Sequence, residues 1–319
     1  MSRRVEPPWD GPVWRDGVEA WTRSELAARG RTVAGEIEEV RTWSLSCVLR
    51  APTSDGWVYF KEALNLPLFA HEPRVTQRLA KLFPGRTPEV LAIHPSRRWM
   101  LTSDAGEIIG WETPEMEWAT PYAQCAHTQR AATEHVADLL AAGCRDRDIG
   151  CLPEQFDAVL EDAETMGLLP DATADALASL GPRLVKACER LGYLGMPNTL
   201  VHGDLHVGNM AVRGGHCVTI DWTDVCISHP FMDGLIPHRM THAPAKERTR
   251  LAILDVWEGA VSPRRLHEAW ELSAFVCPAH HMVSYGSIMA HMPLAMREEL
   301  ADDFGRVAQQ LVDAGAAQG

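Results

Sequence analysis

The sequence VHGDLHVGN at residues 201–209, followed by IDW at 220–222, decides how the rest of the chain is interpreted. The first segment follows an apolar β-like run, so it places the carboxylate of Asp204 and the carboxamide of Asn209 on a loop. The second segment ends the next β-like run with the carboxylate of Asp221. Phosphoryl transfer needs a base beside the accepting hydroxyl and oxygen ligands that hold Mg²⁺ against the phosphates. The spacing offers all three.

The length and charge of the chain limit the alternatives. A chain of 319 residues exceeds what one hydrophobic core usually serves, which predicts two lobes and a cleft between them. Thirty Lys and Arg against forty-three Asp and Glu give a formal charge of −13. This balance argues against binding to nucleic acid or to an anionic membrane, and it is compatible with a cationic substrate or simply with solubility.

The cysteines and the N-terminus indicate a cytoplasmic protein. Eight cysteines are scattered without a C-x-x-C pair, which is typical of a reducing compartment. The first ten residues contain two arginines but no apolar segment after them, and no later stretch reaches the roughly 18 apolar residues of a membrane span.

The first third of the chain has the pattern of an antiparallel sheet. The dipeptide Asp55-Gly56 between two β-prone runs is a strong hairpin signal. We expect two helices and five strands here: helices at about 14–29 and 72–82, and strands at 36–43, 46–51, 57–64, 88–93 and 98–102.

Beyond Gly106 the apolar residues recur mainly at helical spacing. We expect helices at 123–142, 153–166 and 173–191 and from about 231 to the end, interrupted by short strands at 198–202 and 216–220. The predicted fold class is therefore α+β in two lobes. The N-lobe spans 1–105 and carries a small antiparallel sheet with one main helix, and the mostly helical C-lobe spans 106–319.

The motif HGDLHxxN at 202–209 resembles the catalytic loop of the aminoglycoside phosphotransferase and choline kinase superfamily, whose members are related to the protein kinases. The resemblance extends over about residues 35–290 and is sharp only at this loop and at Asp221. It implies a protein-kinase-like fold in which Asp204 is the catalytic base, His202 braces the loop, and Asn209 and Asp221 bind Mg²⁺.

The same resemblance assigns nucleotide contacts in the N-lobe. Lys61 would bind the α- and β-phosphates of ATP and pair with Glu72, although an edge-strand lysine can serve solubility and an acid can simply favour a helix N-terminus. Ser44 and Ser46 would contact the phosphates in a loop without glycines, or form an ordinary turn. Backbone groups of the hinge between the lobes would bind the adenine, at Thr102, Ser103, Asp104 and Ala105.

Acceptor residues are harder to predict from the sequence. Asp224 is the one acid near the catalytic segments that we assign to the substrate, whereas Asp233 would support the catalytic loop. His238 and His242 are four apart and could share a helix face, but no H-E-x-x-H pattern accompanies them, so we expect them to line a polar cleft or to pack.

These observations predict an ATP- and Mg²⁺-dependent O-phosphotransferase that acts on a hydroxyl of a small molecule. An antibiotic hydroxyl, phosphorylated for resistance or self-protection, is the leading interpretation. The alternatives are a metabolic kinase for a sugar, choline or an amino alcohol, and a catalytically idle kinase-like binding module. Fold resemblance does not decide among them, because acceptor specificity resides in the variable helical lobe.

Overall fold

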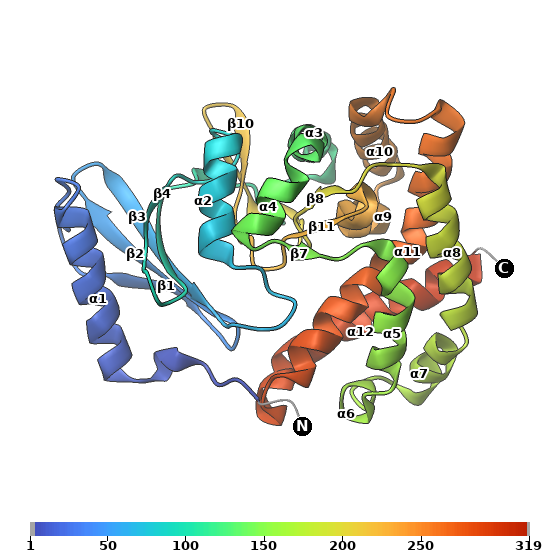
Figure 1. Cartoon of the computed structure of the whole chain (residues 1–319), viewed down its shortest axis with the longest axis horizontal. Coiled ribbons are helices and arrows are strands. Elements are labelled where there is room, and N and C mark those ends of the chain that lie inside the picture. Colours follow the sequence, from blue (N-terminus) through green and yellow to red (C-terminus); the bar gives the residue numbers. More distant parts are fainter. Residues whose placement is uncertain (1–3, 318–319) are drawn as a thin grey trace.

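The computed structural model describes residues 4–317 and shows a sheet-rich part beside a larger helical part (Figure 1). The fold is therefore the α+β, two-lobed, protein-kinase-like arrangement expected from the sequence. The elements of the sheet-rich part are α1 (Pro12–Ala27), β1 (Glu38–Thr42), β2 (Ser46–Thr53), β3 (Gly56–Ala63), α2 (Glu72–Leu82), β4 (Val90–Ile93) and β5 (Trp99–Ser103).

Five antiparallel strands form the N-terminal sheet in the order β1-β2-β3-β5-β4. The predicted hairpin joins β2 to β3, and Gly56 has a positive φ of 108° that suits glycine at this turn. All five predicted strands of this part and both predicted helices are confirmed, with α2 beginning and ending at the predicted residues.

Neighbouring residues of β3 point to opposite faces of the sheet, because side chains alternate along a strand. The side chain of Phe60 packs against Trp14 of α1, with ring centroids 5.9 Å apart, and thereby closes the outer core. The next side chain, Lys61, points the other way and reaches Glu72 of α2. Figure 1 shows α1 and α2 on opposite sides of the sheet. β3 therefore directs Phe60 into the core beneath α1 and the charged Lys61 toward α2.

The second part is mainly helical. Its helices are α3 (Ala119–Ala132), α4 (Val136–Ala142), α5 (Leu152–Leu160), α6 (Ala163–Met166), α7 (Asp171–Ala178), α8 (Gly181–Leu194), α9 (Leu235–Arg239), α10 (Ala243–Trp257), α11 (Pro263–Ala290) and α12 (Leu294–Ala317). Its strands are β6 (Glu107–Ile108), β7 (Arg145–Asp146), β8 (Thr199–Val201), β9 (Met210–Arg213), β10 (His216–Thr219) and β11 (Cys226–Ser228).

Three predicted long helices are each divided in two, so their predicted continuity was wrong. The helix predicted at 153–166 is interrupted at Asp162, which caps α6. Its carboxylate accepts hydrogen bonds from the backbone amides of Glu164 and Thr165. Pro182 cannot donate a backbone hydrogen bond, so α8 starts afresh with Pro182 in its first turn. Between α3 and α4 the chain tightens into a short 3₁₀ turn.

Two small sheets hold the loops between these helices. One has the order β10-β9-β6, the other β7-β11-β8, and four of these six strands (β6, β7, β9 and β11) were not predicted. The segment 202–209 connects β8 to β9, so its two ends are fixed in different sheets. Gly106 lies where the first part leads into β6, and a Cβ there would be 2.3 Å from the carbonyl oxygen of Val212, which only glycine avoids. The boundary at residues 105 and 106 remains a prediction.

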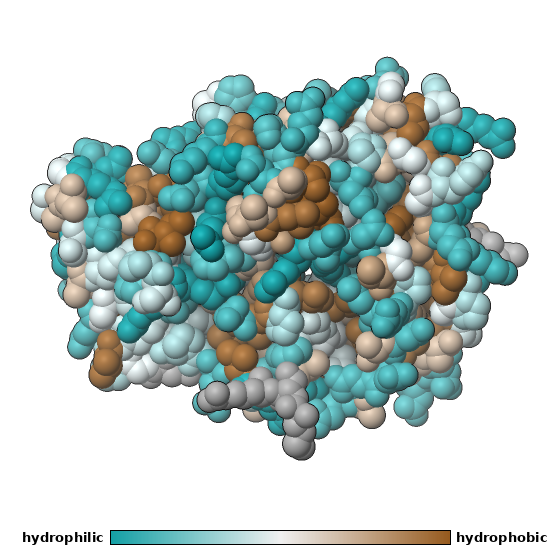
Figure 2. Space-filling view, in the orientation of Figure 1, coloured by the Kyte–Doolittle hydropathy of each residue, from teal (hydrophilic) through white to brown (hydrophobic). Residues whose placement is uncertain are grey.

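The surface agrees with the charged composition. On the face shown in Figure 2, hydrophilic residues predominate and apolar side chains form small, separate patches. Among residues 4–317, no helix combines the length and apolar character that a membrane crossing requires.

Candidate active site

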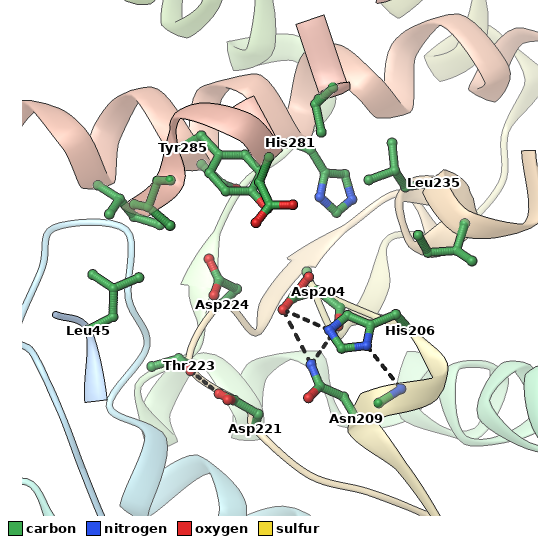
Figure 3. Close-up of a pocket in the computed structure, with 18 of the residues that line it drawn as sticks. Leu45, Asp204, His206, Asn209, Asp221, Thr223, Asp224, Leu235, His281 and Tyr285 are labelled. Carbon is green, nitrogen blue, oxygen red and sulfur yellow. Dashed lines mark hydrogen bonds and ion pairs between the residues drawn. The ribbon is translucent and has the colours of Figure 1, made fainter. Parts of the chain in front are cut away.

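A cavity of about 680 Å³ opens where the sheet, the segment 202–209 and the helices α11 and α12 meet. Figure 3 shows Asp204, Asn209, Asp221 and Asp224 facing this cavity, with Tyr285 of α11 on the opposite wall. Carboxylates and amides from distant segments thus surround one space that is large enough for a small-molecule ligand.

Two buried side chains hold the loop that carries Asp204. The carboxylate of Asp233 accepts from the backbone amides of His202 (2.9 Å) and Gly203 (3.0 Å) and from the side chain of Gln129 (2.7 Å). His202 bonds the carbonyl oxygen of Ile220 at 2.9 Å, and burial lowers its pKa, so the ring is neutral. The loop is therefore fixed from beneath, as the sequence predicts for His202 and Asp233.

The carboxylate of Asp204 is oriented by two neighbours. Nδ2 of Asn209 donates to the backbone oxygen of Asp204 at 3.0 Å and to its Oδ2 at 3.3 Å. Nε2 of His206 lies 3.5 Å from the same Oδ2. Burial alone would raise the pKa of Asp204, but the contact with His206 lowers the pKa below its usual value. Asp204 is thus ionised near neutral pH and could accept a hydroxyl proton.

The buried Lys61 and Glu72 form a charge cluster with Asp221, which lines the cavity. Nζ of Lys61 lies 2.8 Å from Oε1 of Glu72 and 2.5 Å from Oδ1 of Asp221. Burial would lower the pKa of Lys61, but the two carboxylates raise it above its usual value, so the ammonium stays charged. Glu72 also accepts from the amide of Trp222 at 3.1 Å. The predicted pairing of Lys61 with Glu72 is present, and Asp221 joins it.

Asn209 and Asp221 offer the donor set that suits Mg²⁺. Because Asn209 uses its Nδ2 toward Asp204, its amide oxygen is left for another partner, and no donor to that oxygen occurs within residues 4–317. One carboxylate oxygen of Asp221 takes Lys61 and the hydroxyl of Thr223. Two protein oxygen ligands that line one cavity fit an ion that keeps several waters and phosphate oxygens.

Asp224, the residue that the sequence assigns to the substrate, lines the same cavity, and its role remains a prediction. Burial together with the charges of Asp204 and Asp221 raises the pKa of Asp224 to about 8. Its backbone oxygen would be 2.4 Å from a Cβ at position 203, which explains the glycine there.

Several lining residues were not predicted. His206 stands inside the quoted motif, so the motif itself carried a signal for it. Tyr285 and Asp303 come from α11 and α12, about 80 and 100 residues after the catalytic loop, and no local pattern marks them.

The predicted phosphate loop is only partly at the cavity. Ser46 lines the cavity, and its hydroxyl accepts from the indole of Trp43 at 2.8 Å. The amide of Ser44 donates to Glu299 of α12 at 3.3 Å.

The predicted hinge residues lie at the end of β5 and in the turn after it. Thr102 is buried in the strand, Ser103 bonds the backbone of Glu89, and Asp104 accepts from the amide of Gly106. The half-buried Ala105 makes no backbone hydrogen bond within residues 4–317, and none of these four residues lines the cavity.

His238 and His242 do not share a helix face. α9 ends at Arg239, and His242 precedes α10 as its N-cap. The ring of His238 bonds the hydroxyl of Ser273 at 2.9 Å, which is a packing role. No group of three His, Cys, Asp or Glu side chains that could hold a metal occurs among residues 4–317.

Solved structures share this architecture. A choline/ethanolamine kinase family protein from Mesorhizobium loti is 17% identical, covers 93% of this chain and 98% of its own, and has a TM-score of 0.62. A choline kinase from Cryptosporidium parvum is 11% identical, with 94% and 97% covered and a TM-score of 0.62. A macrolide 2′-phosphotransferase from Brachybacterium faecium is 16% identical, with 91% and 98% covered and a TM-score of 0.57.

A comparison with curated protein sequences finds no match. The model of the phosphotransferase enzyme family matches residues 64–269. This range is more than half of the chain and contains Asp204, Asn209 and Asp221. The chain belongs to the phosphotransferase enzyme family.

Proposed function

We propose that this enzyme transfers the γ-phosphoryl group of ATP to a hydroxyl of a small molecule, with Mg²⁺. One observation carries the proposal: Asp204, Asn209 and Asp221 line a single cavity, and Lys61 contacts Asp221 directly beneath it. A lysine, two oxygen ligands and a separate ionised carboxylate are the parts that phosphoryl transfer uses for positioning and charge stabilisation.

In this proposal each side chain has one task. Asp204 orients the acceptor hydroxyl and takes its proton as the oxygen attacks phosphorus. Lys61, held by Glu72, binds phosphate oxygens, and the backbone near Ala105 receives the base of the nucleotide. Asn209 and Asp221 would hold Mg²⁺, which would offset the charge on the phosphates.

An antibiotic is the acceptor class that we propose. One of the three similar structures is named as a macrolide phosphotransferase, and the other two are named as choline or ethanolamine kinases, so a metabolic amino-alcohol kinase is the second candidate. The wall of the cavity contains Asp224, Glu299 and Asp303, which can receive an amino group of either kind of acceptor. An idle binding module is disfavoured because Lys61 and Asp204 both keep the contacts that catalysis needs.

The test is phosphate transfer from labelled ATP and Mg²⁺ to aminoglycosides, macrolides, choline, ethanolamine and simple sugars, with the Asp204→Asn variant alongside. We expect a labelled product with the native enzyme and about 10²–10⁴-fold less with the variant. A product formed equally by both proteins would refute Asp204 as the base. Failure of Mg·ATP to bind at all would refute the kinase activity.

A further inference from the structure

A second cavity, of about 450 Å³, adjoins the first. Three residues line both cavities, namely Trp111, Ile236 and Arg239. Trp111 belongs to the segment that follows β6, and the other two belong to α9. The two cavities therefore lie on either side of these three side chains.

Trp111 links the second cavity to the proposed base. Its indole ring stacks on His206, with centroids 5.3 Å apart and an interplanar angle of 24°. His206 in turn lies 3.5 Å from Oδ2 of Asp204. Trp111 is still 56% exposed, although aromatic side chains of this size are usually highly buried. A large flat surface is thus held two contacts away from the reacting carboxylate and remains free to receive a ligand.

The anchoring of this surface is firm. The rings of Trp118 and Trp111 pack edge to face, with centroids 5.9 Å apart. Nε1 of Trp118 donates to the carbonyl oxygen of Thr113 at 2.9 Å. The hydroxyl of Thr113 donates to the carbonyl oxygen of Ile109 at 2.6 Å. Trp111 is therefore preorganised, which reduces the entropy lost when a ligand binds.

The chemistry of the second cavity is that of a ring-binding site with a polar rim. Pro114 and Met240 give apolar contact. The carboxylate of Glu115 already accepts from the amide of His242 at 3.0 Å. Glu112 and Arg239 are exposed, and neither makes an ion pair within residues 4–317. Arg239 can donate to hydroxyl and ether oxygens, and Glu112 can accept from a hydroxyl or an amine.

We propose that the second cavity is a subsite for a distal ring of the acceptor, which stacks on Trp111 while a hydroxyl of the proximal ring reaches Asp204. The inference rests on the proposed function and narrows its substrate class. The acceptor is a molecule with two or more linked rings that is rich in oxygen, such as a glycoside. A single amino alcohol has no second ring and leaves this subsite empty.

The experiment measures binding by isothermal titration and transfer by steady-state kinetics. The multi-ring probes are kanamycin A and erythromycin A, and the short probes are 2-deoxystreptamine and choline. The variants are Trp111→Ala, Trp111→Phe and, as a control for the loss of an exposed aromatic ring elsewhere, Tyr193→Ala in α8, where the tyrosine is 67% exposed.

We expect a multi-ring probe to bind the native protein. In Trp111→Ala its Kd should rise about 3- to 10-fold, which corresponds to the loss of one ring stack. Trp111→Phe should restore most of this affinity, and Tyr193→Ala should change nothing. The short probes should be insensitive to all three variants, and in turnover the loss should fall on KM with kcat retained.

Three results would overturn the inference. The first is a native protein that binds neither multi-ring probe, and the second is a Kd that does not depend on Trp111. The third is an equal loss for short and long probes together with a fall in kcat, which would mean that Trp111 acts only by positioning His206. These outcomes are distinct from failure of the proposed function. In that case the protein would neither bind Mg·ATP nor hydrolyse it.

Discussion

Replacing Lys61 with methionine should destabilise the protein by about 3–5 kcal/mol. Lys61 is 8% exposed, and Met fills similar space without the charge. The change leaves Glu72, whose side chain is 2% exposed, as a buried carboxylate without a cation, and a broken buried ion pair costs this amount. Asp221 adds little, because its side chain is 38% exposed and water can solvate it.

The assay is thermal unfolding by calorimetry without nucleotide. At roughly 2 °C per kcal/mol, a chain of 319 residues should lose about 6–10 °C in Tm. Adding Glu72→Gln should recover most of the loss, because glutamine removes the unpaired charge and can still accept from the amide of Trp222. Lys81→Met, at an exposed position of α2, is the control and should change stability by less than about 0.5 kcal/mol.

A loss below about 1 kcal/mol in Lys61→Met would refute the reasoning. So would a second loss, in place of a recovery, when Glu72→Gln is added. Either result would mean that water or a rearranged partner already compensates Glu72, and that the pairing contributes little to the fold.

Three further variants test other contacts. Asp204→Asn should lower kcat by about 10²–10⁴-fold and leave the affinity for ATP nearly unchanged, as measured by labelled transfer and nucleotide titration. Asp233→Asn should cost roughly 2–3 kcal/mol in urea unfolding and lower kcat, because an amide cannot accept from three donors at both of its ends. Asp224→Asn tests the pKa near 8: protonated Asp224 supports the fold fully below the unfolded pKa of about 3.9, and this support is lost as the pH rises toward 8. The variant should therefore melt above the native protein at pH 8.5 and close to it at pH 4, and a constant difference would contradict the assignment.

The local part of the fold could be predicted from the sequence. The hairpin was marked by its Asp-Gly turn, and α2 was marked by the helical spacing of its apolar residues and by Glu72 in its first turn. The catalytic loop was marked because all its functional groups lie within eight residues. Such features depend on neighbours in sequence, and one sequence contains all the information that they need.

The remainder depends on contacts between distant segments. The break between α7 and α8 follows from Pro182. A prediction made from the spacing of apolar residues alone misses this break. The strands β6 and β9 pair across about 100 residues and have no strong pattern of their own. Tyr285 and Trp111 reach the cavity only after α11 and the segment after β6 have packed, so no spacing rule could place them there.

Asp221 shows why local rules fail at this site. It is the one non-glycine residue with a positive φ, 62°, among residues 4–317. That conformation costs a residue with a Cβ about 1–2 kcal/mol, and glycine would adopt it freely. Glycine, however, would remove the carboxylate that meets Lys61 at 2.5 Å and faces the cavity. The carboxylate reaches Lys61 only when β3, α2 and the segment after β10 come together, so the strained conformation is retained for the site and not for local stability. Propensity alone argues against a side chain here, and the chemistry of the assembled cleft requires one.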